Sequence, residues 1–491
     1  MTDARRRRAP RALDILVAIV AICLAALIAY PLPRLLWRTF VEDGSPTLSP
    51  FRKAFSLPGI GETIANTVVV LSIATMLATM LACLFAWLNE RTDARLRLIA
   101  DIMPLTPFLV PAIAGTIGWL FLLSPRAGII NVAIRDVTAK VGITITDGPI
   151  DLFSRGGLIF LYVLTLLPFV YLPISAALIR LDPAIEEASR VAGVGPWRTF
   201  FKVTIPAVKP AVASGMLVAV VMGLATFTVP VIIGTSAGID ILSVRIYNLL
   251  TVSYPPDIPS AVALSSVLLV IIAGVSTVQR RIVRSGAYAT VGGKGTRADL
   301  VQLSTLSRRL ARTAMITFFL LACVLPLLAL IYVSLRGFWT PSISLDGLSL
   351  RNYDLVFNQR PVTRSAFLNS VTLAAATAVI GMALMTLLAL YTGAARRGAG
   401  IVDGLAKAPG TLSHLVLAVA FLTAFAGSPF NLGGTLILLL LAYVLLSTPQ
   451  AYLSASSAFT QLSPQLAEAS ATSGGSPGRT LRRITLPLMA P

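Results

Sequence analysis

Residues 187–206 read EASRVAGVGPWRTFFKVTIP, and residues 468–487 read EASATSGGSPGRTLRRITLP. The two stretches share a spaced pattern of acidic, small, glycine and proline residues, offset throughout by 281 residues (468 − 187, 474 − 193 and 487 − 206). Each stretch follows a long apolar region and carries basic residues. A match without gaps in a mostly apolar chain indicates a duplicated cytoplasmic element of a membrane protein. We take as candidate site residues Glu187, Ala188, Ser189, Gly193, Pro206, Glu468, Ala469, Ser470, Gly474 and Pro487.

The composition excludes a soluble globular protein. Of the 491 residues, 56% are hydrophobic and only 12% are charged, and the mean hydropathy is +0.83. The net charge of +19 does not indicate nucleic-acid binding, because the Arg and Lys residues lie in short loops between apolar runs. Cys23, Cys83 and Cys323 all lie within apolar runs, which excludes a disulfide framework or a zinc site.

Ten apolar segments are each about long enough to cross a bilayer as a helix. They form a first series of six and a second series of four, at roughly 13–37, 67–88, 98–123, 157–179, 211–233 and 261–278, then 314–335, 370–391, 405–425 and 436–453. We therefore predict an all-α, polytopic membrane protein.

The basic residues predict the orientation of these spans. With the arginine-rich N-terminus in the cytoplasm as an uncleaved first span, the loops that carry Arg91, Arg198, Arg396 and Arg482 all lie inside. This arrangement satisfies the positive-inside rule at every inner loop.

The order of spans and repeated stretches predicts two parallel six-span repeats in tandem. An even number of spans separates the two copies, so both face the cytoplasm. We predict a first repeat at 1–279, a cytoplasmic linker at 280–312 and a second repeat at 313–491. Because only four residues follow Pro487, we expect the second repeat to be truncated after about four spans.

Each repeated stretch predicts a helix-turn-helix on the cytoplasmic face. Asp182-Pro183 and Ser463-Pro464 are typical helix starts. Gly193 and Gly474 come where a short helix must end and the chain must turn. Small side chains at helical spacing, such as Ala188 and Ala192, permit close approach of another backbone. We expect Pro206 and Pro487 to open the spans that return into the membrane.

These residues resemble a known family, the integral membrane permeases of ATP-binding-cassette (ABC) importers that work with a periplasmic binding protein. Their cytoplasmic signature runs Glu-Ala-Ala, three residues, Gly, nine residues, Ile-x-Leu-Pro. The chain keeps it with Ser189 and Ser470 at the third position and with Val203 and Ile205 as departures in the first copy. A fused pair of such units is similar to the ferric-iron type and also to the thiamine type.

The resemblance implies a permease subunit in a bacterial inner membrane that is not itself an enzyme and holds no cofactor. Its partners would be two copies of an ATPase subunit, which use the ATP, and a periplasmic substrate-binding protein, but no nucleic acid. Glu187 and Glu468 would be polar contacts to the ATPases. Ferric iron is the cargo that we expect; thiamine, a polyamine or a phosphonate remain alternatives. An ion-coupled secondary transporter is the alternative from another class, although it requires mid-membrane ionisable residues, which are scarce here.

The other candidates for a site are weaker. The segment Gly292-Gly293-Lys294-Gly295-Thr296 does not satisfy the phosphate-loop pattern. His414, the single histidine, is interpreted as a polar side chain bonded to a neighbouring helix. Asp101, Asp403 and Lys407 lie near the cytoplasmic ends of their spans, where snorkelling explains them.

Overall fold

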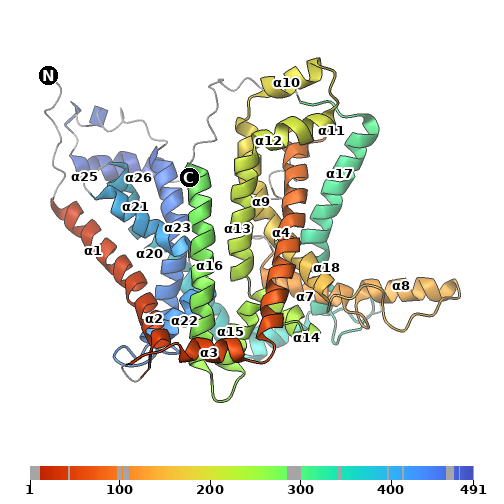
Figure 1. The fold of residues 1–491 in the computed structure, drawn as a ribbon, viewed down its shortest axis with the longest axis horizontal. Coiled ribbons are helices and arrows are strands. Elements are labelled where there is room, and N and C mark those ends of the chain that lie inside the picture. The colour runs from red at the N-terminus through yellow and green to blue at the C-terminus, as the bar shows by residue number, and fades with distance from the viewer. Residues whose placement is uncertain are drawn as a thin grey trace. The chain divides into compact units, whose positions relative to one another are not determined.

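A computed structural model describes most of the chain as helices (Figure 1). The described residues are 11–42, 45–96, 102, 110–284, 300–340, 344–394, 398–411, 414–460, 469–470, 472–474 and 476–489. The chain divides into two compact units, of which one comprises Ser49–Arg360 and the other Met1–Leu48 with Pro361–Pro491.

The unit Ser49–Arg360 contains the first copy of the repeated stretch. Its core is a bundle in which α4, α9, α13 and α16 pack side by side, with α18 against α7. Its helices are α3 (Ser49–Ser56), α4 (Ile60–Arg91), α7 (Ala112–Leu123), α8 (Ile129–Lys140), α9 (Arg155–Arg180), α10 (Pro183–Val191), α11 (Pro196–Thr199), α12 (Ile205–Ala207), α13 (Lys209–Ala225), α14 (Thr235–Ala237), α15 (Leu242–Thr251), α16 (Ile258–Arg284), α17 (Thr305–Phe319), α18 (Leu325–Leu335) and α19 (Arg351–Asp354), with π-helical turns at Phe200–Thr204, Pro230–Gly234, Leu320–Val324 and Leu355–Gln359.

The other unit contains the second copy. It consists of α1 (Arg11–Ala29), α2 (Pro31–Phe40), the two-stranded antiparallel β1 (Val41–Glu42) and β2 (Ser45–Pro46), α20 (Pro361–Gly393), α21 (Ala399–Lys407), α22 (His414–Phe425), α23 (Leu436–Thr460), α25 (Pro477–Thr480) and α26 (Leu486–Met489), with a 3₁₀ turn at Ala408–Thr411 and a π-helical turn at Leu481–Thr485. Its core lies between α20 and α23.

The units exchange the first helices of the two predicted repeats. Helices α1 and α2, from the first repeat, pack against α20, α21 and α22 of the second, where Tyr30 contacts the rings of Phe425 and Phe430. Helices α17 and α18, from the second repeat, belong to the unit Ser49–Arg360, where the ring of Phe318 contacts Phe85 of α4. The predicted division of the sequence into two repeats, with boundaries at 279 and 313, stays a prediction. The two compact units have different boundaries, after Leu48 and after Arg360.

The prediction of an all-α polytopic protein is confirmed. Among the described residues, seven helices are long and apolar enough to cross a membrane, or up to nine if each of two bent helix pairs counts as one span. The longest of the seven are α4 and α20, and the segment Thr305–Leu335 is a third long span.

Two predicted spans are not single straight helices. The expected span 211–233 is wrong at its end, because α13 already ends at Ala225. The chain then continues as two short helical segments, Pro230–Ala237 and Leu242–Thr251, which meet at 87°. The expected span 405–425 is broken at Ala408–Thr411, where Pro409 supplies no N–H for a continuous helix. Of the expected span 98–123, α7 and a few preceding residues are described.

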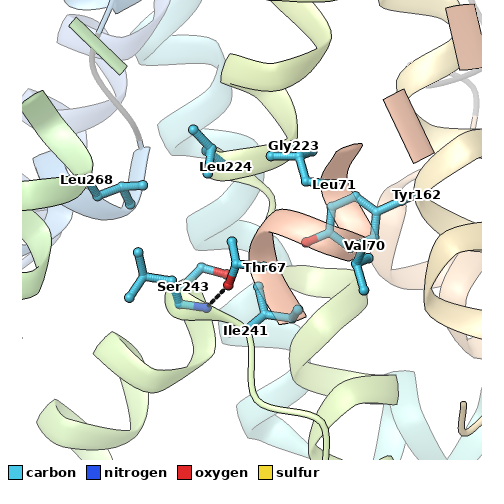
Figure 2. A pocket seen from close by; sticks show the side chains of 10 residues that line it. Thr67, Val70, Leu71, Tyr162, Gly223, Leu224, Ile241, Ser243 and Leu268 are labelled. Atoms are coloured by element: carbon cyan, nitrogen blue, oxygen red, sulfur yellow. Dashed lines mark hydrogen bonds between the residues drawn. The ribbon is translucent and has the colours of Figure 1, made fainter. Parts of the chain in front are cut away.

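Close packing joins α13 and α15 to α4 (Figure 2). The hydroxyl of Thr67 on α4 accepts a hydrogen bond from the backbone N–H of Leu242, at the start of α15, over 2.9 Å. At Gly223 of α13, an added Cβ would lie 2.1 Å from Leu71 of α4. The cavity between these helices, about 10 Å³, is therefore almost filled.

Candidate functional site

The first copy of the repeated stretch forms a helix-turn-helix, which we name loop 1 (residues 182–208), beyond the ends of α9, α4 and α13 (Figure 1). The carboxylate of Asp182 accepts a hydrogen bond from the N–H of Ala184, so it caps α10 as the sequence predicts. Gly193 has a φ of 77°. The N–H of Val194 donates to the carbonyl of Ser189, and that of Gly193 to the carbonyl of Arg190, which is a Schellman closure.

The second part of loop 1 differs from the prediction at Pro206. Pro206 lies inside the short helix α12, and the membrane helix α13 begins at Lys209 after a 74° bend. The prediction that Pro206 opens the returning span is therefore wrong by three residues. Pro210 takes that place in the first turn of α13, where a missing N–H costs little.

The second copy, loop 2 (described at 469–470, 472–474 and 476–489), repeats this geometry. Gly474 has a φ of 75°. A hydroxyl pair joins Ser189 to Thr199 over 2.9 Å in loop 1 and Ser470 to Thr480 over 2.6 Å in loop 2. The π-helical turns Phe200–Thr204 and Leu481–Thr485 also correspond at the same offset of 281 residues. Pro487 lies in α26, as Pro206 does in α12, whereas Glu468 lies outside the described residues.

One face of α10 is open to solvent. The side chain of Glu187 is 49% exposed, and its nearest ion-pair partner, Arg190, is 3.8 Å away. Ala188 and Ala192 are also exposed, as is Ala469 of loop 2. Val191 is 89% exposed at the end of the helix. The small-residue stripe thus remains free for another chain to approach.

The opposite face of α10 carries Glu186, which the sequence analysis did not select. Its side chain is only 5% exposed, and its Oε2 lies 2.8 Å from Nη2 of Arg91, at the end of α4. The Nε of Arg91 donates to the same oxygen over 2.9 Å, and the hydroxyl of Thr204 donates to Oε1 over 2.6 Å. The two opposite charges are therefore paired inside the protein, although Nη2 of Arg91 approaches Glu186 without the geometry of a hydrogen bond.

A signal for Glu186 was present in the sequence. Glu186 and Ser189 are three residues apart on α10, so both fall on its buried face. The signature of the resembled family begins one residue later, at Glu187, which faces outward, and so does not include Glu186.

Aromatic side chains also hold loop 1 to α4. The ring of Trp87, almost fully buried, lies 5.2 Å from the ring of Trp197 and 4.8 Å from that of Phe200, centroid to centroid. Such contacts add to the burial of apolar area. Loop 1 is thus attached to α4 by an ion pair and by an aromatic cluster.

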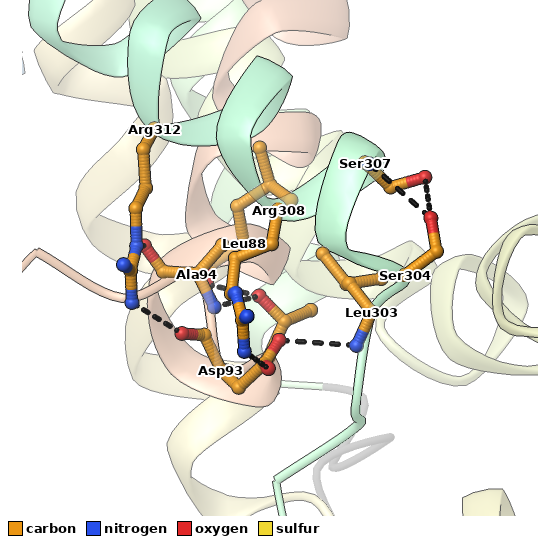
Figure 3. Close-up of polar contacts among 9 residues, drawn as sticks. Leu88, Asp93, Ala94, Leu303, Ser304, Ser307, Arg308 and Arg312 are labelled. Atoms are coloured by element: carbon orange, nitrogen blue, oxygen red, sulfur yellow. Dashed lines mark hydrogen bonds and ion pairs between the residues drawn. The ribbon is translucent and has the colours of Figure 1, made fainter.

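The described end of the predicted linker docks at the end of α4 (Figure 3). The N–H of Val301 donates to the carbonyl of Arg91 over 2.9 Å. The carboxylate of Asp93 accepts from the N–H of Leu303 and pairs with Arg308 at 2.9 Å. Residues 305–312 form the first turns of α17, so this part of the predicted polar linker is helical. The glycine-rich segment 292–296 lies outside the described residues.

Of the remaining candidates, the structure describes the side chains of Asp403 and Lys407, which contact each other. Asp403 lies 2.6 Å from the amine of Lys407 and accepts a hydrogen bond from the hydroxyl of Tyr452. His414 begins α22, and its side chain lies outside the described part of the chain. Asp101 lies outside it as well.

Comparisons with known proteins agree with this architecture. Residues 74–285 match the model of the family described as binding-protein-dependent transport system inner membrane component. The match includes α10 and its Schellman turn.

Curated relatives extend the similarity over more of the chain. A putative ferric transport system permease protein of Haemophilus influenzae is 25% identical over 88% of this chain and 67% of its own length. A ferric transport system permease protein of Actinobacillus pleuropneumoniae is 24% identical over 88% of this chain and 61% of its own length. A spermidine/putrescine transport system permease protein of Salmonella typhimurium is 25% identical over 38% of this chain and 64% of its own length. The chain thus spans about two thirds of the length of these relatives.

The similarity to the two ferric permeases confirms the resemblance noted from the sequence. Through residues 74–285, the chain is similar to the inner membrane components of binding-protein-dependent transport systems.

Proposed function

We propose that the chain is the permease subunit of an ABC importer in a bacterial inner membrane and that its cargo is ferric iron. The observation that carries this proposal is the pair of loops with one geometry, each with a small-residue face open to solvent. A lipid contact does not require a glycine at a fixed position in both copies, whereas a partner protein that docks twice does.

Two copies of a separate ATPase subunit are the partners that fit these loops. Ala188, Ala192 and Ala469 permit close approach of a partner backbone, and the half-exposed Glu187 offers a charge at the edge of that face. ATP-driven closure of the two ATPases would move both loops and switch the membrane helices between outward-facing and inward-facing states. With both loops in the cytoplasm, the N-terminus also lies in the cytoplasm.

The ferric cargo is supported by relatives with ferric transport names over 88% of the chain. A polyamine is the second candidate, because a spermidine/putrescine permease matches 38% of the chain. The binding protein that delivers the cargo would select between them.

The test uses the chain together with the ATPase and the binding protein encoded beside it. We expect the binding protein to retain Fe³⁺ and, when so loaded, to stimulate ATP hydrolysis by the membrane complex. A binding protein that retains spermidine but not Fe³⁺ would replace the ferric cargo by the polyamine. ATP hydrolysis by the chain alone, or transport driven by an ion gradient without ATP, would contradict the importer itself.

A further inference from the structure

The ion pair between Arg91 and Glu186 joins three segments that are distant in the chain. Arg91 ends α4, Glu186 lies on α10, and Thr204, which donates to Glu186, lies on the far side of the turn of loop 1. The backbone carbonyl of Arg91 also accepts the N–H of Val301, just before α17. Arg91 thus connects the end of α4 both to α10 and to the residues just before α17.

The second half can be placed in register with the first from a contact that both halves contain. The hydroxyl of Tyr171 accepts a hydrogen bond from Asn89 over 3.0 Å, and the hydroxyl of Tyr452 pairs with that of Thr392 at 2.8 Å. Tyr452 follows Tyr171 by 281 residues, and Thr392 follows Asn89 by 303. The offset of 303 also relates Asn66 to Asn369, so α4 and α20 correspond along their length.

In this register, both members of the ion pair are alanine in the second half. Arg91 corresponds to Ala394 (394 − 91 = 303), and Glu186 corresponds to Ala467 (467 − 186 = 281). The aromatic cluster is lost as well, because Trp87 corresponds to Leu390 and Trp197 to Gly478. Joint replacement is the change that physical chemistry favours, since removal of one partner would leave the other charge buried and unpaired.

The described part of loop 2 nevertheless keeps the shape of loop 1. Its glycine with positive φ, its hydroxyl pair and its π-helical turn are all present. The ion pair is therefore not needed to fold such a loop. What it supplies is attachment of the loop to the membrane helix.

We propose that Arg91 and Glu186 are positioning residues that make loop 1 and α4 move as one body, so that the two loops pass ATPase motion to the membrane helices unequally. This proposal rests on the proposed function, and it concerns how the ATPase is coupled, not what is transported. Loop 1 is attached to α4 through a buried ionic link, whereas the corresponding positions of the second half carry alanine and offer no such link.

The test compares coupling in the assembled complex. The double variant Arg91→Ala/Glu186→Ala gives these two positions the alanines of the second half. The exposed pair Arg126–Asp147, replaced by alanine at both positions, is the matched control. Each complex, with its ATPase, is placed in proteoliposomes, and ATP hydrolysis is measured per assembled complex with and without the binding protein saturated with Fe³⁺. We expect the ratio of stimulated to unstimulated hydrolysis to fall roughly five- to tenfold in the double variant, and to stay unchanged in the control.

The single variants and Thr204→Val separate positioning from folding. Arg91→Ala and Glu186→Ala should reduce the amount of chain in the membrane more than the double variant does, because each strands a buried charge. Thr204→Val removes only the hydroxyl donor to Glu186 and should lower the stimulation ratio in part, which keeps the proposal testable even if the double variant folds poorly. A normal ratio in the double variant or in Thr204→Val would overturn this proposal alone. No stimulation of the unaltered chain would overturn the proposed function, and this proposal with it.

Discussion

Single residues account for the shape of both loops. The turn after α10 requires a φ near 77° at Gly193, a conformation in which a side chain strains the backbone. Apart from Gly193 itself and its two chain neighbours, no heavy atom of the described residues lies within 4 Å of the position that a Cβ would take there. A substitution at Gly193 is therefore destabilising because of the strained backbone conformation, and not because of a steric clash with neighbouring atoms.

We predict that Gly193→Ser destabilises the protein by about 1–2 kcal/mol, whereas Gly195→Ser does not. Gly195 has a φ of −66° and caps α11, where serine is favourable and where loop 2 already has Ser476. Thermal unfolding of the purified chain in detergent measures both effects. Equal melting temperatures for the two variants would refute the claim that the turn requires glycine at position 193.

A residue at the opposite end of the bundle predicts a pH dependence. Asp257, just before α16, lies 3.0 Å from the amine of Lys53 on α3. Partial burial opposes ionisation of Asp257, but hydrogen bonds from Lys53 and Ser260 outweigh it and hold the pKa of this carboxyl below its ordinary value of 3.8. A lowered folded-state pKa means that the stabilisation is complete above the ordinary pKa and is lost as the pH falls through the lowered one.

We therefore predict that the stability difference between the unaltered chain and Asp257→Asn is constant from neutral pH down to about pH 5 and then shrinks as the solution becomes more acidic. Melting temperatures of the two proteins across this range provide the measurement. A difference that instead grows toward acid pH would mean that the carboxyl is not stabilised by Lys53.

At the scale of elements, the sequence predicted the helix-turn-helix of each loop but not its attachment. The caps and turns depend on neighbouring residues, which a pattern can show, as at Asp182 and Gly193. The ion pair of Glu186 joins residues 95 positions apart, and no local pattern contains that information. The bends before α13 and after Lys407 were missed for a related reason, since hydropathy continues across them while the helix does not.

The docking of the linker is a second element that local patterns did not predict. A polar, glycine-containing stretch is typical of a free linker, yet Val301 and Leu303 are buried and Asp93 holds the start of α17. The first helix of the second repeat is thus fixed at the end of α4.

We predict that Asp93→Ala raises hydrogen exchange at the amide of Leu303 roughly fivefold, which corresponds to about 1 kcal/mol for a lost hydrogen bond. Asp93→Asn, which keeps an acceptor oxygen, should have a smaller effect. Asp151→Ala is the control, because that carboxylate accepts the N–H of Phe153 in a different loop. Unchanged exchange at Leu303 in Asp93→Ala would show that the hydrogen bond does not hold this segment.

At the scale of the whole molecule, composition and repeat were sufficient to predict an all-α polytopic membrane protein, because apolar length and gapless duplication are properties of the sequence itself. The exchange of first helices between the two compact units was not predicted. The spans Asp14–Leu35 and Thr305–Leu335 are ordinary apolar helical segments, and nothing in such a segment specifies which neighbour it packs against.

The central claim is that loop 1 docks an ATPase in the cytoplasm, and site-specific photocrosslinking in cells tests it most directly. A photoreactive amino acid at Val191, 89% exposed on α10, is compared with one at Tyr254, 99% exposed in the loop between α15 and α16. The account predicts that position 191 crosslinks to an ATP-hydrolysing subunit, identified by mass spectrometry, and that position 254 does not. A crosslink to that subunit from position 254, or none from position 191 while the complex hydrolyses ATP, would contradict it.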